Sequence, residues 1–202
     1  IYKAMDMLAR GAEGELYIED EKTLRKIRPE KPYRHPMLDR RIRQFRVRRE
    51  FKVLSKLHEA GVHVPAPLTL DEDSYAFTMT LLPGTLLKEC LDETSLFAGF
   101  DEIIKMHNQH IVHGDLTTMN LLLSENEVYI MDFGLADFSH KAEDKAVDLH
   151  LFFTCLKNEH PEHIEKKEEL EERYRLNARH GEKIIKRSEE IANRGRNKGK
   201  NQ

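Results

Sequence analysis

Two short polar segments lie on either side of a predicted hairpin, and together they constrain the fold more than any other feature of the chain. The first runs from His113 to Asn120 and contains Asp115, and the second is Asp132-Phe133-Gly134. Between them, apolar runs at 121–123 and 128–131 surround a polar turn, which is typical of a β-hairpin. Because a hairpin returns the chain to its starting point, we expect two carboxylates and one amide to come together.

These three side chains suit phosphoryl transfer. Magnesium prefers oxygen ligands and the phosphates of a bound nucleotide, so Asn120 and Asp132 are the candidate ligands of Mg²⁺. A separate carboxylate is needed to orient the attacking hydroxyl or water and to accept its proton, and Asp115 is the candidate base. The competing interpretation is that these residues merely cap turns, which leaves the order of both motifs around the hairpin unexplained.

The spacing resembles the catalytic loop of protein kinases, in which Asp and Asn are five residues apart and Asp-Phe-Gly follows across a short hairpin. By that resemblance, Lys26 sits where kinases place the lysine that holds the nucleotide phosphates. Glu50 sits where its ion-pair partner lies. The alternative for Lys26 is a solvated lysine on the surface of a strand.

Two further segments are expected to contact ATP. The turn Gly11-Ala12-Glu13-Gly14 would cover the phosphates, because glycine permits close backbone approach. It lacks the full G-x-G-x-x-G pattern and could equally be an ordinary hairpin turn. Backbone groups from Thr80 to Leu82 would bind the adenine.

The order of predicted elements indicates an α+β chain with two lobes, and the resemblance to kinases implies a bilobal protein-kinase-like fold. A small antiparallel-sheet N-lobe is expected over 1–82, a reduced helical C-lobe over 83–192 and a basic flexible tail over 193–202. The N-lobe would contain one long helix from Leu38 to Gly61, with Leu38 and Phe45 among its inward residues. Strand-like runs occupy 5–9, 15–18, 23–27, 68–70 and 75–82, and helices are predicted at 85–91, 96–109, 144–157, 162–179 and 182–192.

Two positions differ from typical protein kinases, and a third matches a kinase residue that has a structural role. Gly114 replaces an Arg that couples the loop to activation-segment phosphorylation, so such regulation is not expected. Thr117 replaces a Lys, so one cation of the transition state is missing. Asp148 resembles the buried kinase aspartate that holds the catalytic loop, with a helix N-cap as the rival role. Only 135–147 separate it from the Asp-Phe-Gly motif, so the peptide-docking groove is truncated.

Resemblance to one atypical family covers nearly the whole chain. It is carried by Tyr33-Arg34-His35-Pro36-Met37-Leu38-Asp39, Arg41-Ile42, the loop from His113 to Asn120, and Arg194-Gly195-Arg196. These segments resemble the small atypical serine/threonine kinase and ATPase subunit of the KEOPS complex.

That resemblance implies ATP and Mg²⁺ as cofactors. It implies two partners, the catalytic ATPase-like subunit of the complex and a small regulatory subunit, in an assembly that makes threonylcarbamoyladenosine in tRNA. It also implies that some archaea fuse this subunit to its catalytic partner in the same polypeptide, which would account for a chain that begins with Ile1.

Charge is distributed unevenly along the chain. Residues 22–49 contain twelve Lys or Arg and two acidic residues, although the whole chain has a net charge of -3. We therefore expect tRNA contact through the basic N-lobe helix and the C-terminal tail, by way of the phosphate backbone. A merely solvated helix is the alternative. The basic residues concerned are Arg40, Arg41, Arg43, Arg46, Arg48 and Arg49, then Lys186, Arg187, Arg194, Arg196, Lys198 and Lys200.

Composition excludes other classes. Cys90 and Cys155 stand alone, which argues against a zinc site or disulfide framework and favours a reducing, cytoplasmic compartment. No apolar run approaches the roughly 20 residues of a membrane helix, so no membrane association is expected. Two other functions stay open, a small-molecule phosphotransferase and a nucleotide-binding scaffold that does not turn over.

Overall fold

The chain divides into two compact units, 1–83 and 84–202. The computed structural model describes residues 6–11 and 14–198, and of 195–198 the backbone alone. No helix in this described part is long and apolar enough to cross a lipid bilayer.

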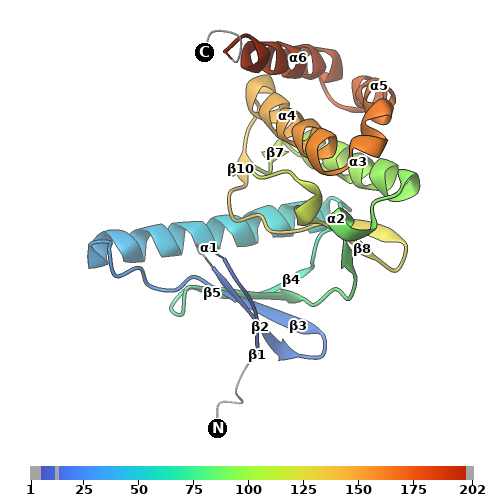
Figure 1. Cartoon of the computed structure of the whole chain (residues 1–202). Coiled ribbons are helices and arrows are strands. Elements are labelled where there is room, and N and C mark those ends of the chain that lie inside the picture. Colours follow the sequence, from blue (N-terminus) through green and yellow to red (C-terminus); the bar gives the residue numbers. More distant parts are fainter. Residues whose placement is uncertain (1–5, 12–13, 199–202) are drawn as a thin grey trace. The chain divides into compact units, whose positions relative to one another are not determined.

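The first unit is built on a five-stranded antiparallel sheet with strand order β1-β2-β3-β5-β4 (Figure 1). Its strands are β1 (Asp6–Arg10), β2 (Glu15–Asp20), β3 (Thr23–Ile27), β4 (Pro67–Asp71) and β5 (Ala76–Thr80). These bounds confirm the predicted strands. Successive side chains of β3 point to opposite faces, so Leu24 and Lys26 are both buried on one face. The lysine therefore does not have the solvated position of the alternative interpretation.

The long helix α1 (Pro36–Glu59) packs against β4 and β5 (Figure 1). The predicted helix is confirmed, but the expectation that Leu38 and Phe45 point inward is wrong, since they are 54% and 60% exposed. Asp39 is the only buried residue of α1 before Val47, where packing against the core begins. Apolar residues keep their helical spacing toward the amino end of α1, beyond the part of the helix that packs against the core.

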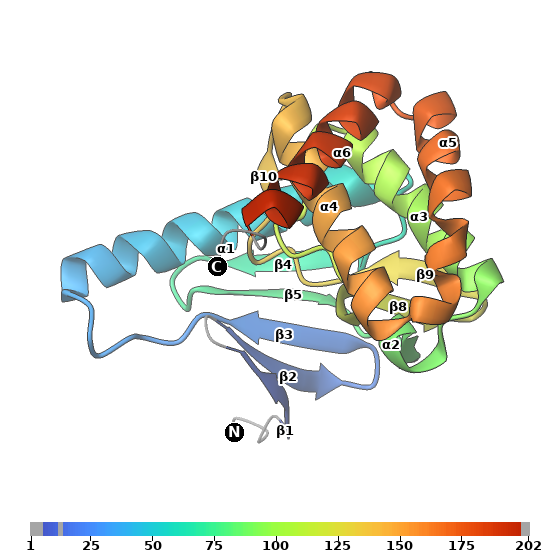
Figure 2. The same cartoon turned by 45° about the horizontal axis from the view of Figure 1, so that its top comes forward.

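The second unit is mainly helical. Its helices are α2 (Leu87–Cys90), α3 (Glu93–Asn108), α4 (Ala142–Glu159), α5 (Lys167–Asn177) and α6 (Gly181–Lys198), with 3₁₀ turns η1 (Thr118–Asn120) and η2 (Pro161–Lys166). Figure 2 shows α4 beside α6, and the ring of Phe100 contacts those of Phe152, Phe153 and Tyr174 at centroid separations of 5.6–6.1 Å. These contacts form the apolar core of the unit.

Helix α6 extends further than the sequence predicted, through Lys198, into the segment expected to be a tail. Ile184, Ile185 and Ser188 are buried along one stripe of this helix, which packs against α4. A packed stripe nucleates a helix, and each following residue then adds a backbone hydrogen bond at little further cost.

Short strands surround the loop that carries the predicted catalytic residues. A three-stranded sheet has the order β6-β8-β9, and a separate pair joins β7 to β10. The strands are β6 (Thr85–Leu86), β7 (Ile111–Val112), β8 (Leu121–Ser124), β9 (Glu127–Ile130) and β10 (Asp137–Phe138). The predicted β8–β9 hairpin is confirmed, and its turn residues Glu125 and Asn126 have positive φ, as a tight hairpin turn requires.

Candidate active site

The loop from His113 to Asn120 brings Asp115 and Asn120 into direct contact. The side-chain amide Nδ2 of Asn120 donates to the backbone oxygen of Asp115 at 2.7 Å and to its Oδ2 at 3.2 Å. Because both bonds use the amide nitrogen, Oδ1 is the Asn120 atom left in a position to bind a cation. The predicted proximity of these two residues is therefore present within one loop.

Met131 ties the Asp-Phe-Gly segment to both ends of that loop. Its N–H donates to the backbone oxygen of Asn120 at 2.8 Å, and Nε2 of His113 donates to its carbonyl oxygen at 2.8 Å. Nδ1 of His113 accepts from the N–H of Asp115 at 3.2 Å, which is consistent with a proton on Nε2. Asp132, the next residue, consequently starts beside the loop that carries Asp115 and Asn120.

Asp132 has an uncommon backbone conformation, with φ of 53°. Its Oδ1 accepts from the N–H of Gly134 at 3.2 Å, and the side chain is exposed. The neighbouring Phe133 is buried, with its ring 5.2 Å from that of His113. A left-handed residue costs about 1–3 kcal/mol and persists where the surroundings over-determine it, and Phe133 provides such an anchor.

Asp148 holds the start of the loop, as predicted. Its Oδ2 accepts from the N–H of His113 at 2.6 Å, and its Oδ1 from the N–H of Gly114 at 2.9 Å. Nε2 of His107 lies 3.2 Å from Oδ2. Burial alone would raise the pKa of Asp148, but the hydrogen bonds from His107 and the two backbone donors outweigh it and hold the pKa below its ordinary value.

Two further buried side chains, His107 and Tyr174, form a chain of hydrogen bonds that ends at Asp148. Burial lowers the pKa of His107 despite the neighbouring carboxylate, so the imidazole is neutral and its Nε2 carries the proton toward Asp148. Its Nδ1 lies 2.8 Å from the hydroxyl of Tyr174, which must then donate. Burial, together with the charge of Asp148, raises the pKa of Tyr174, so this hydroxyl keeps its proton.

Gly114 is required by the backbone at the position where kinases have Arg. Its φ is +80°, and an added Cβ would lie 2.7 Å from the backbone oxygen of Leu135. Any L-residue here would be strained and would collide with the segment that follows Asp-Phe-Gly. The missing arginine is therefore a consequence of how this loop packs.

In the first unit, the predicted ion pair between Lys26 and Glu50 is present. Nζ of Lys26 lies 2.6 Å from Oε1 of Glu50, and both side chains are nearly inaccessible, at 8% and 2% exposure. Arg28 provides a third member, at 2.5 Å from Oε2 of the same carboxylate. The shared carboxylate fixes the lysine, because each of the two buried cations has one of its oxygens within hydrogen-bond distance.

The turn before β2 is only partly described. The N–H of Gly11 donates to the oxygen of Gly14 at 2.9 Å, and an added Cβ on Gly14 would lie 3.3 Å from Cε of Lys26. The glycine thus permits the lysine stem to pass close to the backbone. Ala12 and Glu13 lie outside the described residues, and phosphate covering by this turn stays a prediction.

At the segment predicted to bind adenine, two backbone donors are already used within the first unit. The N–H of Thr80 donates to Ala66 at 2.9 Å, and that of Leu81 donates to Lys22 at 2.7 Å. We therefore expect any adenine contact by a backbone N–H to fall to Leu82.

The donor set of the loop fits magnesium bound together with a nucleotide. An amide oxygen from Asn120 and a carboxylate from Asp132 are hard ligands, and Mg²⁺ commonly takes only one or two protein ligands beside phosphates and water. Within residues 6–11 and 14–198, no group of three or more His, Cys, Asp or Glu side chains could hold a metal ion.

Comparison with known proteins gives the family. The model of the RIO domain matches residues 17–149. A protein of Archaeoglobus fulgidus named probable serine/threonine-protein kinase BUD32 homolog is 36% identical over 186 residues, which cover 92% of this chain and 93% of the relative. This chain belongs to the Bud32 family of RIO-domain proteins. The KEOPS complex subunit Bud32 of Pyrococcus abyssi is 34% identical over 172 residues, covering 77% of the chain and 78% of that subunit.

Some relatives of this Bud32-family chain are much longer. The probable bifunctional tRNA threonylcarbamoyladenosine biosynthesis protein of Methanosarcina mazei is 33% identical over 195 residues, covering 95% of the chain but 35% of the relative. The chain thus spans about a third of the length of such relatives.

A solved structure confirms the predicted kinase-like fold. The Rio2 kinase of Chaetomium thermophilum, crystallised as an ADP/Mg²⁺-phosphoaspartate complex, aligns with a TM-score of 0.63 at 17% identity, covering 77% of this chain and 56% of the kinase. At that identity the likeness concerns the fold alone.

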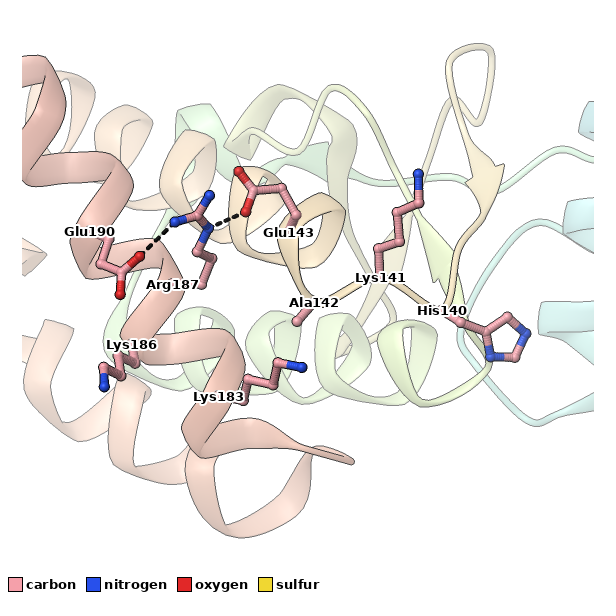
Figure 3. Close-up of a pocket in the computed structure, with 8 residues that line it drawn as sticks. All are labelled: His140, Lys141, Ala142, Glu143, Lys183, Lys186, Arg187 and Glu190. Carbon is pink, nitrogen blue, oxygen red and sulfur yellow. Dashed lines mark hydrogen bonds and ion pairs between the residues drawn. The ribbon is translucent and has the colours of Figure 1, made fainter.

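A separate basic pocket lies between the amino end of α4 and the exposed face of α6 (Figure 3). Its lining residues are His140, Lys141, Ala142, Glu143, Lys183, Lys186, Arg187 and Glu190. Arg187 bonds to both glutamates of the pocket, at 2.6 Å from Glu190, so the positive charge of the pocket resides mainly on the three lysines. Lys186 and Arg187, expected to act as part of a basic C-terminal tail, are thus held on a packed helix.

Several supporting residues were missed in the sequence. Arg28, His107 and Tyr174 have no motif of their own. Arg28 could have been noticed because it lies two residues after Lys26, just beyond the end of β3, which in an extended chain places it on the same side. No comparable signal marks His107 and Tyr174, whose partners are distant in sequence.

Proposed function

We propose that this Bud32-family chain binds ATP with Mg²⁺ and transfers the γ-phosphate to water or to a serine or threonine hydroxyl. The observation that carries the proposal is the assembled loop, in which Asn120 bonds Asp115 while Met131 ties the Asp132 segment to the same loop. Named relatives and the RIO-domain match support a phosphotransferase of the atypical kinase class.

Each residue has a role that follows from its position. Asp115 is exposed, and the bond from Asn120 to its Oδ2 leaves Oδ1 to accept the proton of the attacking hydroxyl. Oδ1 of Asn120 and the carboxylate of Asp132 would hold Mg²⁺, which neutralises charge on the phosphate oxygens when bound. Lys26, oriented by Glu50, would hold the α- and β-phosphates as a point charge.

We further propose that the chain acts inside a KEOPS-type assembly that makes threonylcarbamoyladenosine in tRNA. The names of the Pyrococcus and Methanosarcina relatives support this setting, as does the resemblance in sequence. The proposed partners are the catalytic ATPase-like subunit and the small regulatory subunit. Exposed Arg40 and Arg41 on α1 are candidate contacts for tRNA phosphates, and the lysines of the α4–α6 pocket are a second set.

The experiment is ATP turnover with Mg²⁺, for the wild type, Asp115→Asn and Asp132→Ala, alone and then with the partner subunits and tRNA. We expect Asp115→Asn to lower kcat by about 10²–10⁴-fold while nucleotide still binds, because a general base is lost. Asp132→Ala should weaken Mg²⁺-dependent nucleotide binding. The matched control is Asp101→Asn. It removes the charge of an exposed carboxylate in the same unit, which pairs with Arg173.

The outcome decides between function classes. Unchanged turnover in Asp115→Asn would contradict the assigned base. A scaffold that does not turn over predicts that Asp115→Asn leaves tRNA modification by the assembly intact. A small-molecule phosphotransferase predicts that one metabolite, and not the partner subunits or tRNA, stimulates ATP consumption.

A further inference from the structure

The catalytic loop has a second buried attachment, at the end opposite Asp148. Oγ1 of Thr118, in the first position of η1, lies 3.1 Å from Nε2 of His160 and 3.5 Å from Sγ of Cys155. Thr118 is fully buried, and His160 is only 6% exposed. The 3.1 Å contact gives the buried hydroxyl and the buried ring nitrogen a hydrogen-bond partner, as buried polar groups require.

The position of the imidazole is set by a junction between helices. His160 is the residue at which α4 ends and η2 begins. Its N–H donates to Leu156 at 2.9 Å, and its carbonyl accepts from His163 at 3.0 Å. The backbone of His160 is therefore fixed on both sides, and its ring extends from this junction to the loop.

The direction of the hydrogen bond follows from the charges near the ring. Nδ1 of His160 lies 3.8 Å from a carboxylate oxygen of Glu162, which favours a proton on Nδ1. Nε2 then accepts, and the hydroxyl of Thr118 donates to it. The thiol of Cys155 can donate to the same threonine oxygen.

Thr118 is connected through the backbone of the 3₁₀ turn to Asn120, the predicted metal ligand. The N–H of Asn120 donates to the carbonyl of Thr117 at 3.0 Å, which closes the 3₁₀ turn around Thr118. The side chain of Asn120 in turn bonds Asp115. A displacement of Thr118 would therefore move both the amide and the carboxylate.

We infer that His160 is a positioning residue that acts through Thr118 to hold Asn120 and Asp115 in the geometry for the magnesium-nucleotide complex. The inference rests on the proposed function, and it assigns the loop two separate anchors. Asp148 fixes the segment that begins at His113, and His160 fixes the turn that ends at Asn120.

The test uses substitutions that separate the hydrogen bond from the packing. Thr118→Val keeps the shape of the side chain and removes the hydroxyl, whereas Thr118→Ser keeps the hydroxyl. His160→Leu removes the ring acceptor, and His160→Gln restores an acceptor oxygen. Thr154→Val is the matched control, since Thr154 is exposed on α4 and its hydroxyl bonds only the carbonyl of His150 among the contacts described.

Two readouts are measured on the full chain, well below the melting temperature of every variant. Amide hydrogen exchange at Asn120 reports the turn without any ligand, and we expect it to accelerate in Thr118→Val and His160→Leu while exchange at His113 is unchanged. In ATP turnover with Mg²⁺, the same two variants should lower kcat about 10-fold, since small misplacement of catalytic groups is costly. Thr118→Ser and His160→Gln should stay near the wild type.

The double variant Thr118→Val with His160→Leu should be no worse than either single change, because both remove one bond. Additive losses would overturn the inference, as would a lower melting temperature with unchanged exchange at Asn120 and unchanged kcat. Absence of turnover in the wild type would defeat the proposed function only. The exchange measurement would still decide whether His160 holds the turn.

Discussion

Asp148→Asn is the substitution whose effect follows most directly from the structure. Oδ2 of Asp148 accepts from the N–H of His113 and from His107, and Oδ1 accepts from the N–H of Gly114. An asparagine can place its single oxygen at the Oδ2 position and keep two of these bonds. Its amide NH₂ then faces the N–H of Gly114, so one donor of the catalytic loop loses its partner.

The size of the effect can be worked from these contacts. A hydrogen bond to a charged group contributes about 1.5–3 kcal/mol, and the two bonds that survive become neutral and weaken to about 0.5–1.5 kcal/mol each. We therefore expect Asp148→Asn to lower the free energy of unfolding by about 3.5–6 kcal/mol. For a chain of this size that corresponds to a fall in melting temperature of about 7–24 °C.

The assay is urea denaturation followed by far-ultraviolet circular dichroism, with hydrogen exchange at the His113 and Gly114 amides. Asp101→Asn is the control, because it makes the same change of charge in an exposed pair with Arg173 and should cost under about 1 kcal/mol. If Asp148→Asn costs no more than this control, or if both amides keep their protection, Asp148 does not hold the loop in the way described.

Three further predictions concern stability. Glu50→Leu should lower the free energy of unfolding by about 3–5 kcal/mol, because it leaves buried cations without their shared carboxylate. Lys26→Met should lower it by less but abolish nucleotide binding. Urea denaturation measures the first effect and binding of a fluorescent nucleotide the second, and a larger loss of stability in Lys26→Met than in Glu50→Leu would contradict this reasoning. Gly114→Ala should destabilise more than Gly61→Ala in thermal melts, since both have positive φ but only Gly114 would collide with a neighbour; equal losses would refute the steric argument. The lowered pKa of His107 means that, below about pH 6.5, the unfolded chain binds a proton that the folded chain excludes. The free energy of unfolding should therefore decrease as the pH is lowered from about 6.5, by up to about 1.4 kcal/mol per pH unit. His107→Gln should flatten that slope between pH 7.5 and 5.5, and an unchanged slope would show that His107 does not contribute.

The fold and the core of the site were predictable because their signals are local. The β8–β9 hairpin, with two apolar runs around a polar turn, follows from short stretches of sequence. Lys26 and Glu50 were assigned by the resemblance to kinases, and the structure places them in contact because Lys26 lies on the buried face of β3. The kinase resemblance then indicated which polar residues to connect.

What was missed depends on contacts that no local pattern encodes. Strands β6, β7 and β10 contain two residues each, too short for any alternation to be visible. The bond from Thr118 to His160 joins residues 42 positions apart, and the bond from His107 to Tyr174 spans 67. Phe45 matched the helical period, although its side chain is 60% exposed and its ring lies against the guanidinium of Arg49 on the same helix.

The central claim is that one loop and the adjoining Asp132 assemble a magnesium-nucleotide site around Asp115. The most direct measurement is a crystal structure of the chain with Mg²⁺ and a non-hydrolysable ATP analogue. The account predicts one cation about 2.1 Å from Oδ1 of Asn120 and from the carboxylate of Asp132, with Asp115 facing the γ-phosphate and not bound to the metal. A cation held without Asn120 and Asp132, or one ligated by Asp115, would contradict it.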